Sequence, residues 1–267
     1  MGYHVEQPFR IPAQARDFEG FRRWARSNRF PDYGRIDYIG GDLEVDVGPE
    51  PFRIPAQAWS FEGFRRWARS NRFPKSGRID YVGGDLEVDM SPEDLLKHGT
   101  VKAEIGAELQ IRIARRNLGD VYVDRALVSF PASELSVEPD VVVVLYSSLD
   151  TGRVREIPRK KREPESYIEL EGAADLVVEV ISDSSVGKDR RRLPPRYAAA
   201  GVPELWLVDV RRNLRFEIYV LAEGAYRLTV PEADGWVRSL LLGPVRLRRE
   251  RVRPDRWSYR LDVGTGD

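Results

Sequence analysis

The chain contains no cysteine, which excludes disulfides, zinc–thiolate sites, iron–sulfur clusters and cysteine nucleophiles. Histidine is nearly as scarce, because His4 and His98 are the only two. A histidine-cluster metal centre or a histidine-based triad would have to use one of these two residues. Neither has a second histidine near it in the sequence, so such sites are disfavoured.

Long apolar segments are also absent. No run approaches the roughly 18 apolar residues that a membrane helix needs. The first residues, MGYHVEQPFRIPAQ, lack the apolar core of a signal peptide. We therefore expect a soluble, cytoplasmic protein. Its 267 residues are enough for one substantial core with an appendage.

The formal net charge is zero, since 43 basic residues balance 43 acidic ones. The charges are nevertheless segregated along the chain. Basic clusters occupy residues 153–162, 188–196 and 246–253, whereas residues 37–50 and 80–94 lean acidic. Basic clusters on a neutral protein can bind phosphate backbones, although each could equally be a solvated face.

Residues 8–50 recur almost unchanged as residues 51–93, with 36 of the 43 positions identical. Each copy contains a short helix pattern, FEGFRRWARS, followed by two strand patterns joined at a Gly-Gly hairpin signal. In the second copy Ser60 is a candidate N-cap. Only the second copy runs directly into the rest of the chain. We therefore predict that residues 1–50 are a duplicated N-terminal appendage and that residues 51–267 form the catalytic domain.

After the repeat, apolar residues at helical spacing predict a long helix over residues 101–116. A short helix pattern further on ends at Gly201. Strand patterns cover residues 120–130, 138–146, 174–182, 203–210, 214–222 and 223–230. The links between the last three are too short for a crossover, which predicts antiparallel pairing. The order of elements indicates an α/β fold, a mixed sheet with helices packed on it.

Two acidic residues interrupt these apolar strand patterns. Asp140 stands at the head of PDVVVV, and Glu179 lies within DLVVEVIS, where an ionised carboxylate is costly unless it is paired or metal-bound. If the two strands are neighbours, the carboxylates converge and repel, and a divalent cation relieves that repulsion. Mg²⁺ suits such a site because it takes hard oxygen ligands and needs few carboxylates. Alternatively, Asp140 stabilises a strand end and Glu179 pairs with a buried arginine from the RRR segment.

An ordered set of five segments resembles a known family. The segments are MSPED…H, EPDVVVV, DLVVEVIS, SSVGKD and YAAAGVPELWLVD. Over roughly residues 51–260 they resemble the Uma2 family, within the PD-(D/E)XK superfamily of restriction-endonuclease-like proteins. The resemblance implies a restriction-endonuclease-like core, DNA as the partner, Mg²⁺ or Mn²⁺ as the cofactor, and a homodimer as one assembly. It also implies that Asp140 and Glu179 are the metal-binding acids, with His98 and Glu104 near the site.

The sequence departs from the superfamily pattern at one position. The pattern has a lysine two residues after the second acid, where this chain has Ile181. Strand side chains alternate between faces, so Ile181 points the same way as Glu179 and cannot polarise a water. Lys188, within GKD, is the candidate replacement, since arginine is too basic to be a general base. Lys188, His98 and Glu104 could equally be ordinary surface, capping or helix residues.

The leading hypothesis is a metal-dependent endonuclease that cleaves DNA. Asp140 and Glu179 would hold the metal, and Lys188 would orient or deprotonate the attacking water. A basic segment would contact the DNA backbone, through Arg159, Lys160, Lys161 and Arg162. The alternative, motivated by Ile181, is a nuclease fold that binds nucleic acid or a partner without cleavage. A serine hydrolase built on SDSS is weaker, because a GxSxG motif is absent.

Overall fold

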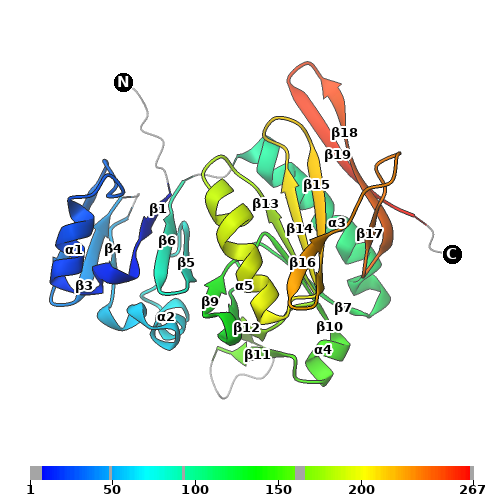
Figure 1. Cartoon of the computed structure of the whole chain (residues 1–267). Helices are drawn as coiled ribbons and strands as arrows, with labels where there is room; N and C mark the ends of the chain where they lie inside the picture. Colours follow the sequence, from blue (N-terminus) through cyan, green and yellow to red (C-terminus); the bar gives the residue numbers. More distant parts are fainter. Residues whose placement is uncertain (1–7, 48–49, 92–93, 160–165, 265–267) are drawn as a thin grey trace.

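The structure, a computed structural model, describes residues 8–47, 50–91, 94–159 and 166–264. Two large sheets form the body, and two three-stranded sheets lie at its ends (Figure 1). The seven-stranded sheet has the order β1 (Phe9–Ile11), β6 (Asp85–Asp89), β5 (Arg78–Val82), β9 (Leu135–Val137), β8 (Val128–Phe130), β12 (Tyr167–Gly172), β11 (Val154–Pro158). The six-stranded sheet has the order β16 (Ala225–Leu228), β15 (Arg215–Ala222), β14 (Glu204–Asp209), β13 (Leu176–Val180), β10 (Val141–Leu145), β7 (Gly119–Val123).

The smaller sheets are built from strands at the two ends of the chain. They comprise β2 (Arg35–Ile39), β3 (Asp42–Asp46) and β4 (Phe52–Ile54), and then β17 (Val237–Ser239), β18 (Gly243–Arg253) and β19 (Arg256–Val263). The helices are α1 (Phe18–Ala25), α2 (Phe61–Ala68), α3 (Thr100–Arg112), α4 (Tyr146–Asp150) and α5 (Leu193–Ala200). Short helical turns are η1 (Ala13–Arg16), η2 (Ala56–Trp59), η3 (Leu95–Gly99), η4 (Ala114–Arg116), η5 (Pro131–Ser133) and η6 (Lys188–Arg192).

The six-stranded sheet is covered by helices on both faces, which explains its continuous apolar strands. Val141 and Val143 of β10 belong to the core beneath α3, whereas Val142 and Val144 belong to the core beneath α5. Successive strand residues point to opposite faces, so a strand buried on both sides must be apolar throughout. The same reason accounts for the runs in β13 and β14, which are fully buried. The predicted strands at these positions are confirmed.

The structure confirms the predicted helices and the residues predicted to cap them. The predicted long helix corresponds to α3 with η4. Gly201 ends α5 with a φ of 85°, a left-handed conformation that glycine adopts without strain. Ser60 caps α2, because its side-chain oxygen accepts the Gly63 N–H at 3.2 Å. Strands β14, β15 and β16 are antiparallel, as their short links predict.

The strand predicted over residues 120–130 differs in the structure, which divides it into β7 and β8. Asp124 and Arg125 between them have φ angles of 58° and 53°. Two successive left-handed residues turn the chain, so the two halves enter different sheets. The expected α/β architecture is present, but it contains two large sheets rather than one.

The two copies of the repeat exchange their first strands. Strand β1 of the first copy pairs with β6 of the second, and β4 of the second copy pairs with β3 of the first. The backbone just after each exchanged strand also forms a hydrogen bond with the other copy. Ala13 N–H donates to Asp85 at 2.9 Å, and Ala56 N–H donates to Asp42 at 2.5 Å. The copies therefore share one hydrophobic core.

The second copy packs on the body of the protein through both its hairpin and its helix. Its strand β5 pairs with β9, and Arg65 Nε of α2 donates to Glu169 at 2.6 Å. The corresponding face of the first copy is solvent-exposed: Phe18 is 55% exposed where Phe61 is 8% exposed. The division of the chain at residue 50 stays a prediction, and the exchanged strands cross that boundary.

We expect that deleting residues 2–50 leaves the melting temperature within about 4 °C of the full chain, a shift of about 1 kcal/mol or less. The freed segment Phe52–Ile54 has the same sequence as β1 and can take its place beside β6. Thermal unfolding monitored by circular dichroism measures the shift.

A longer deletion, of residues 2–54, is the matched control. It removes both copies of the exchanged strand and leaves β6 without this partner, so its melting temperature should fall well below that of the shorter deletion. Equal melting temperatures would show that the exchanged strand contributes nothing to the stability of the body. An insoluble product from the 2–50 deletion would show that the first copy is part of the catalytic core.

Candidate active site

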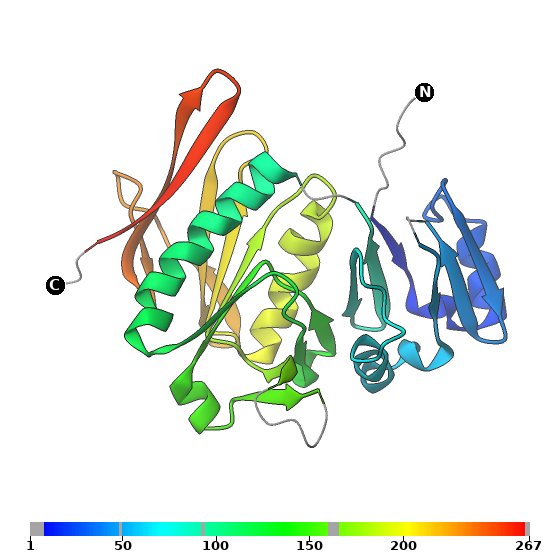
Figure 2. The same cartoon turned by 180° about the vertical axis from the view of Figure 1, so that it is seen from behind.

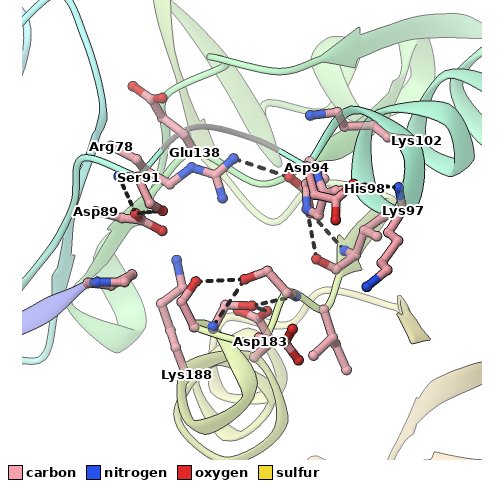
Figure 3. A pocket seen from close by; sticks show the side chains of 18 of the residues that line it. Arg78, Asp89, Ser91, Asp94, Lys97, His98, Lys102, Glu138, Asp183 and Lys188 are labelled. Carbon is pink, nitrogen blue, oxygen red and sulfur yellow. Dashed lines mark hydrogen bonds and ion pairs between the residues drawn. The ribbon is translucent and has the colours of Figure 1, made fainter. Parts of the chain in front are cut away.

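A cavity of about 820 Å³ opens where the two large sheets meet. Arg78 of β5 lines it from the seven-stranded sheet, and Asp140 and Val180 line it from the six-stranded sheet. Figure 3 shows Lys188 reaching into it from η6, opposite His98 of η3 and Lys102 of α3. The cavity thus gathers charged side chains from segments that are far apart in the sequence.

Asp140 and Glu179 are neighbours on one face of the six-stranded sheet. Strands β10 and β13 pair antiparallel with Val141 opposite Val178, so the next position sets Asp140 opposite Glu179. Directly opposed residues of an antiparallel pair share a face and lie about 4.5–5.5 Å apart at Cβ. Asp140 also accepts the Val180 N–H at 2.7 Å, so the strand pairing itself orients its carboxylate.

Asp140 is buried and is held as an anion. Arg78 Nη2 donates to Oδ1 at 3.1 Å, and His98 Nε2 lies 3.3 Å from Oδ2. Burial alone raises the pKa of Asp140, but the hydrogen bond to His98 and the charge of Arg78 outweigh it and hold the pKa well below its usual value. His98 Nε2 is also 2.8 Å from the Val180 carbonyl oxygen, so this nitrogen carries a proton.

Glu179 has the opposite protonation state. It is 2% exposed, and its Oε1 accepts a hydrogen bond from the Tyr197 hydroxyl at 2.6 Å. Burial, followed by the charges of Asp189 and Asp140, raises the pKa of Glu179 well above its usual value. Burial and Glu179 also raise the pKa of Tyr197, so the phenol stays protonated. The pKa shifts of these two adjacent acids therefore have opposite directions, which favours an ionised Asp140 beside a protonated Glu179.

The buried arginine considered as the partner of Glu179 is not found in the RRR segment. Arg190 pairs with Glu217 at 2.7 Å, and Arg192 pairs with Asp85 at 2.8 Å. A tyrosine from the following helix, α5, supplies the hydrogen bond instead. That residue, Tyr197, has the apolar neighbours expected of a core side chain, and it also orients the acid.

Lys188 reaches the site from a helical turn rather than from the strand. Its Nζ lies 2.7 Å from Asp80 Oδ2, and Asp80 is 1% exposed. Burial lowers the pKa of Lys188, but Asp80 and Asp189 outweigh it and raise the pKa above its usual value. Ile181, at the usual lysine position, is buried in the apolar core beneath α5.

Four buried acids lie at the cavity or directly behind its wall, and they outnumber the two strong bases paired among them. The carboxylates are Asp80, Asp140, Glu179 and Asp189, and the strong bases paired among them are Arg78 and Lys188. Full ionisation of these six groups would leave two negative charges in excess, and the third buried base at the cavity, Lys102, pairs separately with Asp124. Both Glu179 and Asp189 respond to this excess: the pKa of Glu179 is raised well above its usual value, and burial and nearby Asp140 raise the pKa of Asp189 to about 6 against the opposing effects of Lys188 and Ser185.

A divalent cation would resolve the same excess. Within the part of the chain that the structure describes, three or more His, Asp or Glu side chains are not preassembled as a ligand set. Mg²⁺ accepts one or two carboxylates with waters and phosphate oxygens in the remaining positions. The adjacent pair of Asp140 and Glu179, together with the uncompensated charge, therefore fits such an ion.

The structure brings Asp140, Glu179, Lys188 and His98 together, but it does not bring Glu104 to the cavity. The Glu104 carboxylate accepts the N–H of Leu261 in β19 at 3.0 Å. Glu104 lies on a different face of α3 from the cavity, because six residues along a helix do not return to the same face as His98. Its observed contact is structural.

The predicted nucleic-acid-binding segment lies mostly outside the described residues, where Lys160, Lys161 and Arg162 fall. Arg159 is described and is exposed, just beyond the end of β11. Its backbone N–H donates to the Ser166 carbonyl at 2.8 Å. The role of this segment stays a prediction.

Arg78 and Asp80 are site residues that sequence reasoning missed. They belong to an Arg-Ile-Asp stretch that is repeated as residues 35–37, where Arg35 simply pairs with Asp37 at 2.6 Å on the surface. An alternating charged stretch in a hairpin indicates a solvent-facing strand. The two copies are identical here, so the local sequence cannot reveal that one of them lines a cavity.

Comparison with known proteins identifies the family of the chain. The family model Uma2, described as "Putative restriction endonuclease", matches residues 61–248. The match covers well over half of the chain, so the protein belongs to the Uma2 family, which confirms the family resemblance. No curated protein matches the chain. None of the helices within the described ranges is long and apolar enough to cross a membrane.

A solved structure is also similar, the crystal structure of "a putative nuclease belonging to DUF820 from Anabaena variabilis ATCC 29413". The two chains share 15% identity with a TM-score of 0.48, over 66% of this chain and 89% of that chain.

The repeat offers a matched test of the charge network. Arg78→Ala should lower the free energy of unfolding at pH 7 by on the order of 3 kcal/mol, because it leaves Asp140 buried with one cation fewer. Arg35→Ala, at the identical position of the first copy, should change it by less than about 1 kcal/mol, since its partner is exposed. Urea unfolding measures both, and equal destabilisation would contradict the assigned role of Arg78.

The pH dependence follows from the direction of the Asp140 shift. A depressed pKa stabilises the fold above the unfolded value, near 3.8, and this contribution is lost as the pH falls toward the folded pKa. The difference in free energy of unfolding between wild type and Arg78→Ala should therefore decrease as the pH falls and Asp140 becomes protonated. A difference in free energy of unfolding that stays constant down to pH 2 would mean that Arg78 acts through packing alone.

Proposed function

We propose that the protein is a metal-dependent endonuclease that hydrolyses phosphodiester bonds of DNA. The observation that carries this proposal is the buried Asp140–Glu179 pair on one sheet face, beside a cavity lined by Arg78 and Lys188. Membership of the Uma2 family supports the reaction class. The fold alone would support a nuclease less strongly, because folds host many functions.

Asp140 and Glu179 would hold Mg²⁺ or Mn²⁺. A bound metal of this kind stabilises charge on phosphate oxygens and lowers the pKa of a bound water. Ligation by Glu179 requires loss of the proton that its raised pKa retains, so metal affinity should increase with pH. The hydrogen bond from Tyr197 keeps the Glu179 carboxyl in one orientation in either protonation state.

Lys188 and Arg78 would stabilise the negative charge of the phosphate in the transition state. The raised pKa of Lys188 keeps it an ammonium group, which donates hydrogen bonds and does not abstract a proton at neutral pH. Of the two roles expected for Lys188, orientation of the water or phosphate is therefore favoured over deprotonation. His98 donates to Asp140 and the Val180 carbonyl, and it acts as a positioning residue.

A second candidate is a nuclease fold that binds nucleic acid without cleaving it. Two observations favour it: Ile181 occupies the usual lysine position in the core, and Arg78 already neutralises Asp140. A metal would have to compete with that guanidinium. Cleavage with and without added metal separates the two candidates.

Asp140→Asn and Glu179→Gln should each abolish cleavage, because both remove a negative charge with little change in volume. Nicking of plasmid DNA in the presence of Mg²⁺ or Mn²⁺ measures the activity, and circular dichroism confirms the fold. Asp37→Asn in the first copy is the control, since Asp37 lies on the surface and should leave cleavage unchanged. Cleavage that survives both site substitutions would refute the assignment of the acids.

Lys188→Ala should lower the cleavage rate by about 10²–10⁴-fold if its ammonium group acts on the reacting phosphate or water. Lys188→Arg should recover part of the rate, because it keeps the charge opposite Asp80. Single-turnover cleavage measures both variants. An undiminished rate for Lys188→Ala would show that another residue supplies the lysine function.

A further inference from the structure

The hairpin of β18 and β19 extends beyond the core as a two-stranded ribbon (Figures 1 and 2). Its base is anchored by buried side chains, namely Val245, Leu247, Tyr259 and Leu261. In contrast, every residue from 250 to 258 is exposed. We call residues 248–258 the outer ribbon, since they add a regular strand pair to the protein but almost no buried surface.

The ribbon concentrates positive charge. Between residues 246 and 260 the acids are Glu250 and Asp255, and the arginines are Arg246, Arg248, Arg249, Arg251, Arg253, Arg256 and Arg260. Asp262 neutralises the base of the ribbon, where its Oδ1 accepts from Arg248 at 2.9 Å. Further out, Arg249, Arg251 and Arg253 pair with no carboxylate of the described residues.

The strand register increases the cost of these charges. Arg248 lies opposite Arg260, and Arg253 lies opposite Arg256. Like charges in directly opposed positions destabilise a strand pair. The exposed outer ribbon gains little from burial to offset that repulsion. An anion bound across the ribbon would reduce the repulsion between the opposed arginines.

The ring of Trp257 holds two of these arginine side chains in place. The guanidinium carbons of Arg249 and Arg251 lie 4.4 Å and 5.7 Å from the centroid of its ring, which is 42% exposed. Stacking on an aromatic ring holds guanidinium groups in place without using their N–H donors. Arg251 also donates from Nε to the Pro254 carbonyl oxygen at 3.1 Å and from Nη2 to the same oxygen, which leaves its Nη1 donors available. The result is a row of arginine donors along one face of the ribbon, which suits successive phosphates.

The ribbon is fixed to the helix that leads into the site. The Leu261 N–H donates to Glu104 of α3 at 3.0 Å, and η3, directly before α3, carries His98 to the cavity. Figures 1 and 2 both show the ribbon rising on the side of the molecule where α3 begins. A long polyanion entering the cavity can therefore reach the ribbon as well.

We propose that the outer ribbon is a DNA-binding arm that enters the major groove of a duplex. The B-DNA major groove, about 12 Å wide, admits a two-stranded ribbon, whereas the deep, narrow major groove of duplex RNA does not. Arginines on the ribbon contact the phosphates that flank the groove. Binding by the arm is independent of catalysis, but its use in cleavage rests on the proposed function.

The test compares two triple variants of the full chain whose charge is reduced equally. One, Arg251→Gln/Arg253→Gln/Arg256→Gln, lies in the outer ribbon, and the other, Arg16→Gln/Arg23→Gln/Arg29→Gln, lies on the exposed surface of the first repeat copy. Fluorescence anisotropy with a labelled DNA duplex in EDTA measures the dissociation constant over a range of salt concentrations. EDTA removes divalent metal, so binding is observed without cleavage.

The ribbon variant should bind at least about tenfold more weakly, and the slope of log K against log salt should fall by about 2.7, or about 0.9 for each phosphate that an arginine no longer neutralises. The first-copy variant should bind like wild type. The melting temperature of the ribbon variant should not fall, because the outer ribbon is exposed. If the triple variant is unfolded, Arg253→Gln alone should reduce the slope by about 0.9.

Three outcomes overturn the arm: equally weakened binding by the two triple variants, equally ribbon-dependent binding of duplex RNA, or ribbon-dependent binding of anionic vesicles but not of DNA. The proposed function fails in a different way. A protein that binds DNA through the ribbon but does not cleave it with Mg²⁺ or Mn²⁺ refutes the nuclease and retains the arm. A protein that cleaves DNA while ribbon variants bind normally refutes the arm and retains the nuclease.

Discussion

The ion pair between Arg78 and Asp140 joins the two large sheets at the point where the cavity opens. Arg78 comes from β5 of the seven-stranded sheet, and Asp140 stands at the head of β10 in the six-stranded sheet. The pair of Lys188 and Asp80 connects η6 to the same β5 strand. The charged residues therefore hold together the walls of the site that they line, which couples its chemistry to the stability of the fold.

The negative charge of the buried acids in this site can be reduced either by protonation or by a bound cation. Without a cation, burial and neighbouring acids raise the pKa of Glu179, which favours its protonated form. With a cation, the proposed pairing with Asp140 would exchange that proton for a metal. Buried ion pairs often contribute no more stability than well-packed apolar residues would, and such local costs are expected at functional positions.

The repeat shows how tertiary surroundings change the meaning of one local sequence. Arg35 and Asp37 form an exposed ion pair with each other, whereas Arg78 and Asp80 each bind a partner from the body. The hairpins themselves are alike, with the same register around the Gly-Gly turn. The difference arises because the hairpin of the second copy lies against β9 and the cavity wall, whereas that of the first copy does not.

The amino-acid sequence by itself determined the elements whose periodicity is strong: α3, the buried strands β10, β13 and β14, and the Gly-Gly hairpins. It also pointed to Asp140 and Glu179, because an acid inside an apolar strand stands out without any knowledge of its neighbours. Only the tertiary structure decided that Arg78 and Asp80 join them, that Tyr197 holds Glu179, that Glu104 turns toward β19, and that the repeat copies exchange strands. The physical reason is that periodicity reports which face of an element is buried, whereas these contacts depend on which distant segment covers that face: Arg78 and Asp140 are 62 residues apart in the chain.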